Sequence, residues 1–170
     1  WNPGLRETVV EAHLFDAARR IEDGQKSLGT ALKKLKELQE AANQKVDDKV
    51  LPVEQAAKVV SIAEAALRKF EAEPASIRAR SAADRARAHS PNAPETPGLV
   101  AAAAHAERLV AAEAAYEKVL AAELNVLQAT AEKRADAEAQ LAEAEKVLQT
   151  ARKAIDLAGD SYESLAGALK

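Results

Sequence analysis

Cysteine is absent from this chain, and aromatic residues make up only 3% of it. The lack of cysteine excludes disulfides, thiolate metal sites, thiol catalysis and covalent attachment of haem within these residues. No run of about 18 apolar residues is present to cross a bilayer. The opening Trp1-Asn2-Pro3-Gly4 has neither the basic nor the apolar region of a signal peptide. We therefore expect no membrane insertion, and any export signal would lie outside these residues.

Charge is also close to balanced. The formal net charge is −3, and 30% of the residues are charged. This composition is typical of a solvated surface with many ion pairs, and it argues against bulk attraction to nucleic acid or to an anionic membrane. We expect no nucleic-acid partner.

The apolar residues that are present are mostly small. Hydrophobic residues make up 48% of the chain, but most of them are alanine. An alanine methyl buries little area, so at roughly 25 cal/mol per Å² the core must be thin. Stability must then come from larger aliphatic side chains spread along extended helices.

A seven-residue repeat places these apolar residues, with a large position and a small one. This pattern is typical of long helices that pack closely against one another. The repeat comprises Leu14, Ala17, Ile21, Gly24, Leu28, Ala31, Leu35, Leu38 and Ala42; then Val53, Ala56, Val60, Ala63, Leu67, Phe70 and Ile77; and finally Leu141, Ala144, Leu148, Ala151, Ile155 and Ala158.

Proline, glycine and polar residues divide the repeat into three helices within a single domain, 1–170. The predicted helices span about 5–46, 53–88 and 97–158, and an exit segment follows at 159–170. The breaks are Asp47-Asp48-Lys49 with Pro52, and Ser90-Pro91-Asn92-Ala93-Pro94-Glu95.

Local signals indicate how these helices begin and end. Asn2 and Thr96 are predicted N-caps, and Pro97 takes a first-turn position that needs no N–H donor. Gly159 is predicted to end the third helix in a left-handed conformation. Pro74 should kink or locally break the second helix.

The short links predict an all-α fold, an elongated antiparallel three-helix coiled-coil bundle with a long third helix. In the middle of that helix the apolar spacing drifts, which indicates a stutter and a local change of twist or partner. The drifting positions are Tyr116, Leu120, Leu124, Leu127, Ala131 and Ala135. We expect the first helix to cover the third-helix seam between Leu120 and Leu141, which favours a monomer. If that seam stays exposed, a dimer is the alternative.

Candidate catalytic and metal sites are weak. His13 and Asp16 lie one helical turn apart, but two ligands make a poor metal site, and no Glu-x-x-His pair accompanies them. His89 and His105 are more simply explained as helix-end or solvated side chains. No glycine-bounded nucleophile or phosphate-binding loop occurs. We therefore predict no catalytic, cofactor-binding or metal residue, and no tight binding of haem or a transition metal by this segment.

Four arginines form the strongest cluster of charge: Arg78, Arg80, Arg85 and Arg87. Their spacing winds around the helix, and base-stacking aromatic residues are lacking, so a phosphate-binding face is disfavoured. Pairing with acids of the third helix is the preferred interpretation. The predicted partners are Glu132, Asp136, Glu138, Glu143 and Glu145.

Several segments resemble a known family. They are Leu67-Arg68-Lys69-Phe70, the run from Ile77 to Arg87, Ala103-Ala104-His105-Ala106-Glu107-Arg108, and the two ends, Trp1 to Arg6 and Asp160 to Lys170. Together they resemble the alanine-rich helical insert of large planctomycete proteins that combine a cytochrome-c-like domain with planctomycete-specific domains of unknown function.

The resemblance implies a periplasmic or cell-surface parent protein that carries haem c elsewhere, through a Cys-x-x-Cys-His motif that has no counterpart here. The predicted function is a noncatalytic helical spacer or docking module that contacts neighbouring domains or another protein. The alternative is an interaction or self-association module that acts through the exposed seam of the third helix. An enzyme or ligand carrier would need convergent polar groups in a cavity, and none is evident in the sequence.

Overall fold

The computed structural model describes residues 3–42 and 50–168. They form four helices: α1 (Pro3–Ala42), α2 (Val50–His89), α3 (Thr96–Gln128) and α4 (Arg134–Ala168). No strand occurs within these two ranges. The all-α class is thus confirmed, whereas the prediction of three helices was wrong.

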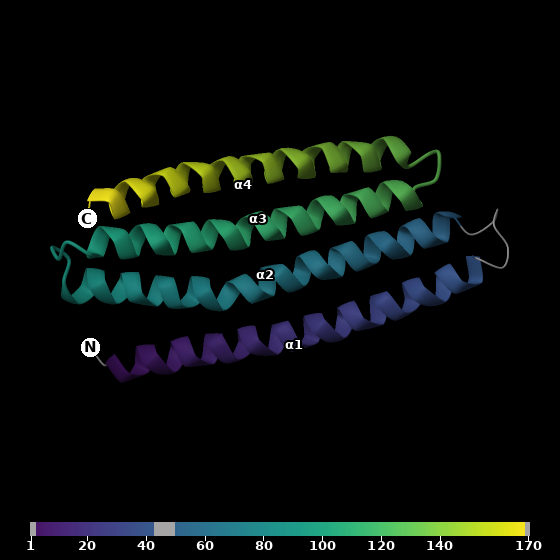
Figure 1. The fold of residues 1–170 in the computed structure, drawn as a ribbon. Coiled ribbons are helices and arrows are strands. Elements are labelled where there is room, and N and C mark those ends of the chain that lie inside the picture. Colours follow the sequence, from purple (N-terminus) through teal and green to yellow (C-terminus); the bar gives the residue numbers. More distant parts are fainter. Residues whose placement is uncertain (1–2, 43–49, 169–170) are drawn as a thin grey trace.

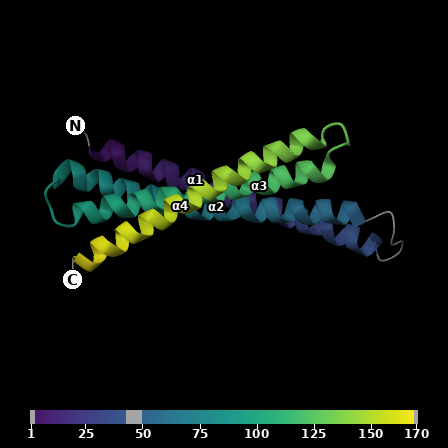
Figure 2. The ribbon, with the colours of Figure 1, turned by 90° about the horizontal axis from the view of Figure 1, so that it is seen from above.

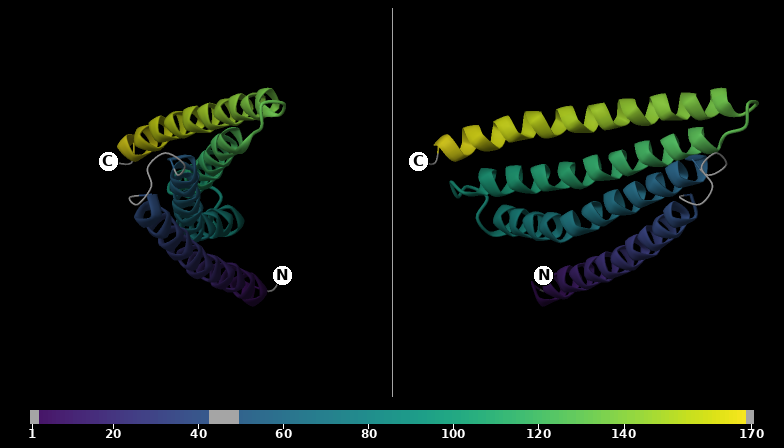
Figure 3. Two further views of the ribbon diagram at one scale, coloured as in Figure 1. Left: turned by 90° about the vertical axis from the view of Figure 1, so that its right-hand side faces the viewer. Right: turned by 45° about the vertical axis from the view of Figure 1, so that its right-hand side comes forward.

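The four helices form an open, twisted layer in which each runs antiparallel to the one before it (Figure 1). Among the described residues, contacts join only consecutive helices: α1 with α2, α2 with α3, and α3 with α4. Seen from above, α4 crosses α1 at an angle (Figure 2), and the side views show the four helices stacked in chain order (Figure 3). Because α1 does not contact α3, the layer is not the closed bundle that the sequence predicted.

The long third helix is replaced by a hairpin, α3 and α4, with a turn at residues 129–133. Ala129 leaves the helical conformation at φ −69° and ψ 135°. The amide of Lys133 then donates to the carbonyl of Thr130 over 3.0 Å. This reversal lies where the apolar spacing drifts, and it allows the two halves of the predicted helix to cover each other. The predicted stutter is therefore a reversal of the chain.

The predicted end of the last helix was also wrong. α4 continues through Gly159 to Ala168, and no described glycine has a positive φ. Gly159 therefore does not act as a left-handed cap, and the exit segment is helical as far as Ala168. A glycine inside a helix costs about 1 kcal/mol relative to alanine, which the residues on either side can offset.

Thr96 has a different role from the predicted cap. The N-cap of α3 is Glu95, whose side chain makes no capping hydrogen bond, and Pro97 lies in the first turn as expected. Thr96 is buried, and its hydroxyl donates to the carbonyl of Ser90 over 2.7 Å. This bond ties the α2–α3 link together. The predicted cap Asn2 and break Asp47-Asp48-Lys49 lie outside the described residues.

Both prolines of α2 are accommodated within the helix. Pro52 lies in its first turn, where the missing N–H has no intrahelical partner in any case. Pro74 lies inside the helix, which remains continuous, and the α2 ribbon changes direction part-way along its length (Figure 1). The bend is expected because Pro74 cannot donate to the carbonyl of Phe70.

The repeat positions face the neighbouring helices, and the core is as thin as the composition implies. In α1, Ala17, Gly24 and Ala31 are buried, while the large positions are half-buried. No large side chain in the described ranges is fully buried. The accessible surface is 11311 Å², whereas a compact monomer of this mass would expose about 8,100 Å². The side chains of Ala42 and Ala158 lie outside the described part.

Gly24 of α1 packs closely against Phe70 and Leu67 of α2, and it offers a matched test. A Cβ there would lie 3.2 Å from Phe70 Cδ2, whereas a Cβ at Gly29 would have no neighbour within 4 Å. Gly29→Ala should raise the free energy of unfolding by about 1 kcal/mol through helix propensity. Gly24→Ala should lower the free energy of unfolding by about 1 kcal/mol, because the cost of overpacking against Phe70 outweighs the gain in helix propensity. Urea denaturation followed by circular dichroism measures both free energies. Equal stabilisation by the two substitutions would show that the α1–α2 interface has room for a methyl group at Gly24.

Leu148 tests the α3–α4 interface. It clusters with Ala115 and Val119 of α3, whereas Glu145 of α4 is exposed. Leu148→Ala should lower the free energy of unfolding by about 2 to 3 kcal/mol through loss of buried volume. Glu145→Ala should change it by no more than about 0.5 kcal/mol. Similar effects of the two substitutions in thermal or urea denaturation would contradict the described facing of α4.

Candidate functional site

The two ends of the layer differ in what they contain. At the proximal end α1 begins and α4 ends, so that both chain ends lie on the same side (Figure 1). At the distal end lie the C-terminus of α1, the N-terminus of α2 and the turn between α3 and α4. A helix of 40 residues, such as α1 or α2, is about 60 Å long at 1.5 Å per residue. The distal end is thus far from the chain ends.

An apolar cleft of about 280 Å³ lies at the distal end and is lined by residues of three helices. We call it the distal cleft. Its lining residues are Ala31, Lys34 and Leu38 of α1, Pro52, Gln55, Ala56 and Val59 of α2, and Gln128 of α3. Val59 is 40% exposed although it is a large aliphatic residue. Lys34 is the one charged residue of the lining, so the cleft suits an apolar group with a polar or acidic edge.

A second cleft, of about 340 Å³, lies against the turn between α3 and α4. Its lining is mostly polar: Asn125, Gln128, Ala129, Lys133, Asp136, Ala137 and Gln140. Neither distal cleft is lined by a histidine or a hydroxyl nucleophile. Their linings offer apolar contacts and hydrogen-bonding groups, and the charged residues among them are Lys34 in the first cleft and Lys133 and Asp136 in the second.

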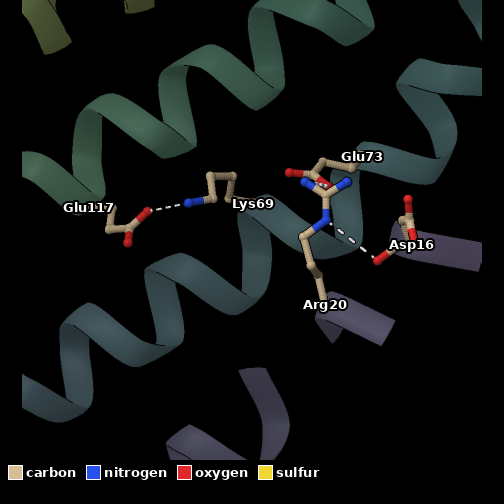
Figure 4. A network of polar contacts seen from close by, with 5 residues as sticks. All are labelled: Asp16, Arg20, Lys69, Glu73 and Glu117. Carbon is tan, nitrogen blue, oxygen red and sulfur yellow. Dashed lines mark hydrogen bonds and ion pairs between the residues drawn. The ribbon is translucent and has the colours of Figure 1, made fainter. Parts of the chain in front are cut away.

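Ion pairs fix the α2–α3 interface, and each has its base on α2 and its acid on α3. Lys69 and Glu117 approach to 2.6 Å, and both side chains are less than a third exposed (Figure 4). The other pairs are Lys58 with Glu123 at 2.8 Å, Arg68 with Glu113 at 3.2 Å and Arg80 with Glu107 at 3.5 Å. Charges arranged in this way favour one register of the two helices more than they add stability.

One ion pair crosses from α1 to α2. Arg20 lies 3.1 Å from Glu73, whose side chain is largely buried, and Arg20 also donates to the carbonyl of Asp16 (Figure 4). On the surface of α1, Lys26 donates to Glu22 over 2.7 Å. This hydrogen bond lowers the pKa of Glu22 and raises the pKa of Lys26. Both pairs have a structural role.

The three histidines lie apart from one another, and only Asp16, one turn from His13 on α1, accompanies one of them as predicted. His13 is exposed beside Arg20, and His89 lies at the end of α2. His105 is half-buried in α3. In the part of the chain that the structure describes, no three histidine, cysteine or carboxylate side chains are grouped to hold a metal ion. No helix described here has the length and hydrophobicity to span a membrane.

The arginine cluster pairs with the predicted third helix at Arg80, but not through the acids named from the sequence. Arg80 pairs with Glu107 of α3, and Arg87 pairs with Asp84 in its own helix. The acids proposed from the sequence lie in α4 or in the distal turn, and α4 does not contact α2. Two of them pair locally instead: Glu138 with Arg134, and Glu143 with Lys146. The reversal at residues 129–133 moved these acids away from the arginines.

The seam predicted on the third helix is covered, but not by α1. Leu120 is buried, Leu141 is half-buried, and α4 packs on α3 in this region. The predicted cover was therefore wrong, since α1 contacts only α2. Sequence reasoning missed the distal cleft because three helices form it. The one local signal was Pro52, which places a rigid ring at the start of α2.

Comparisons with protein-family models, with curated proteins and with solved structures gave no match to this chain.

The ion pairs between α2 and α3 predict a salt-dependent stability. Glu117→Gln should lower the free energy of unfolding by about 0.5 to 1 kcal/mol at low salt, because Lys69 keeps its charge without a partner. Glu143→Gln, in an exposed pair within α4, should cost no more than about 0.3 kcal/mol. In about 1 M NaCl the two variants should converge. Urea denaturation at both salt concentrations checks this, and a cost at Glu117 that is independent of salt would indicate lost packing instead.

Proposed function

We propose that this chain is a noncatalytic helical arm that docks a partner protein or a neighbouring domain at its distal end. The observation that carries this proposal is the distal cleft, an apolar site lying about 45 to 50 Å from the end at which α1 begins and α4 ends. An apolar cleft with a polar rim is a common form of protein-binding site.

The course of the chain favours an arm over a spacer that holds two flanking domains apart. With four antiparallel helices, segments joined before α1 and after α4 would attach at the same end of the layer. A spacer that separates two flanking domains would have them at opposite ends. An arm instead carries its far end away from its attachment, which suits docking.

The sequence resemblance extends the proposal to the parent protein. We propose that the arm belongs to a larger exported protein that carries haem c in another domain, at the periplasm or cell surface. The quoted segments from Ile77 to Arg87 and from Ala103 to Arg108 support this. Finding a Cys-x-x-Cys-His motif in the same polypeptide would test it, and a full-length gene product without one would contradict it.

Val59 gives the sharpest test of distal docking. Val59→Glu should weaken capture of the partner by at least about tenfold, because a charge is placed in an apolar contact. The matched control is Leu109→Glu, since Leu109 is 41% exposed, close to the 40% of Val59, and lies outside the distal cleft. Capture of a partner by the immobilised chain, followed by calorimetry with that purified partner, measures both affinities.

The two variants separate docking from general stickiness. Distal docking requires loss of affinity with Val59→Glu and unchanged affinity with Leu109→Glu, while circular dichroism shows that both remain helical. If both substitutions weaken capture equally, or if neither does, the distal cleft is not the docking site.

A further inference from the structure

The turn between α3 and α4 consists of residues that are compatible with a helix. Its sequence is Ala129-Thr130-Ala131-Glu132-Lys133, without glycine or proline. No described residue, in this turn or elsewhere, has a positive φ. Alanine, glutamate and lysine are good helix formers, and threonine costs only about 0.6 kcal/mol relative to alanine. The reversal is therefore maintained by the packing of α4 on α3 and not by the turn itself.

The apolar stripes of the two helices would also join smoothly. On α3 Ala115 and Val119 pack with Leu148 of α4, and Leu141 and Ala144 lie against this cluster. The seven-residue spacing extends these stripes to Ala122 and Val126 on α3 and to Ala137 on α4, all buried or half-buried. Val126 and Ala137 are eleven residues apart in the sequence, and eleven residues make about three helical turns. In one continuous helix the two stripes would lie on the same face.

The contacts between α3 and α4 are arranged symmetrically about the turn. Arg108 donates to the carbonyl of Ala154 over 3.3 Å, and each lies 23 residues from Ala131. Ala115 and Leu148, which pack in one cluster, lie 16 and 17 residues from Ala131. Two continuous helices crossing antiparallel at Ala131 would therefore reproduce these contacts, with α4 of each copy on α3 of the other.

We propose that two copies of this chain form a dimer by exchanging α4, with α3, the turn and α4 fused into one helix that pairs with the same helix of the second copy. The partner is a second copy because its α3 presents the same surface that α4 covers within one chain. The proposal depends on the fold and not on the function proposed above.

The rest of the layer permits the exchange. α4 contacts only α3, so its departure leaves the α1–α2 and α2–α3 interfaces intact. The fused helix from Thr96 to Ala168 would contain 73 residues and extend about 110 Å. The proximal ends of the two copies would then point in opposite directions. The exchanged dimer would therefore form a bridge, whereas the single chain forms an arm. Its formation requires high concentration and prior detachment of α4.

Distances within one chain distinguish exchange from any other dimer. The chain has no cysteine, so Ala111→Cys and Arg152→Cys, both at exposed positions of adjacent helices, give two unique sites for spin labels. Doubly labelled chains are diluted into unlabelled chains at millimolar concentration, warmed, cooled and measured by pulsed electron resonance. The hairpin predicts a separation of one interhelical distance plus the labels, whereas the fused helix predicts about 60 Å.

Variants of the turn provide the control. Thr130→Pro suits the hairpin, because Ala129 already has the extended backbone that a following proline requires. In a fused helix the same proline should weaken dimerisation by about a hundredfold per helix. Thr130→Ala should strengthen dimerisation about threefold per helix. Sedimentation equilibrium measures both dissociation constants, and circular dichroism shows that each variant remains helical.

Exchange predicts a dimer with the long intrachain distance, lost with Thr130→Pro and strengthened with Thr130→Ala. A chain that remains monomeric after annealing at millimolar concentration would overturn the proposal. A dimer that keeps the short intrachain distance, or that forms equally well with Thr130→Pro, would overturn it too, because such a dimer would associate through surfaces outside the α3–α4 interface.

Discussion

The number of apolar faces on each helix determines the architecture. In α1 and α4 one stripe of alanine, leucine and isoleucine is buried or half-buried against the one neighbouring helix, while large apolar residues such as Phe15 of α1 and Val147 of α4 stay exposed. α2 and α3 bury residues on two faces and have two neighbours. Among the four described helices, α2 and α3 therefore lie inside the layer and α1 and α4 lie at its two edges. Small residues such as Gly24 allow the close approach that a thin core requires.

The repeat of large and small residues predicted the first two helices and their facing, but the turn could not be predicted in this way. Local signals at two positions point opposite to the structure: Gly159 favours an end where α4 continues, and the segment 129–133 favours a helix where the chain reverses. At both positions tertiary packing outweighs local propensity, because the free energy gained by burying two apolar stripes exceeds the conformational preferences of a few residues. In the sequence, the turn at residues 129–133 is indicated only by a change in the spacing of the apolar residues.

The candidate site was harder to predict than the fold. Leu38, Val59 and Gln128 come from three helices, and only the connections between these helices bring them to one cleft. The sequence suggested a seam between Leu120 and Leu141, which is apolar as expected. That seam is covered within the hairpin by the packing of α3 and α4 on each other. The apolar periodicity thus identified an interface correctly, but it could not identify which helix covers it.

One reversal therefore decides the geometry of the whole chain. With three helices the chain would leave at the end opposite to its start, and with four it returns to the same end. The residues at this reversal have little intrinsic preference for a turn. The proposed fused helix would also keep almost all of the α3–α4 contacts of the hairpin, with α4 supplied by the second copy. What separates them is the effective concentration of α4, which is high within one chain and depends on protein concentration between two. In the exchange that we propose, the same apolar stripe would be covered within one chain or between two, without a change in the residues that it buries.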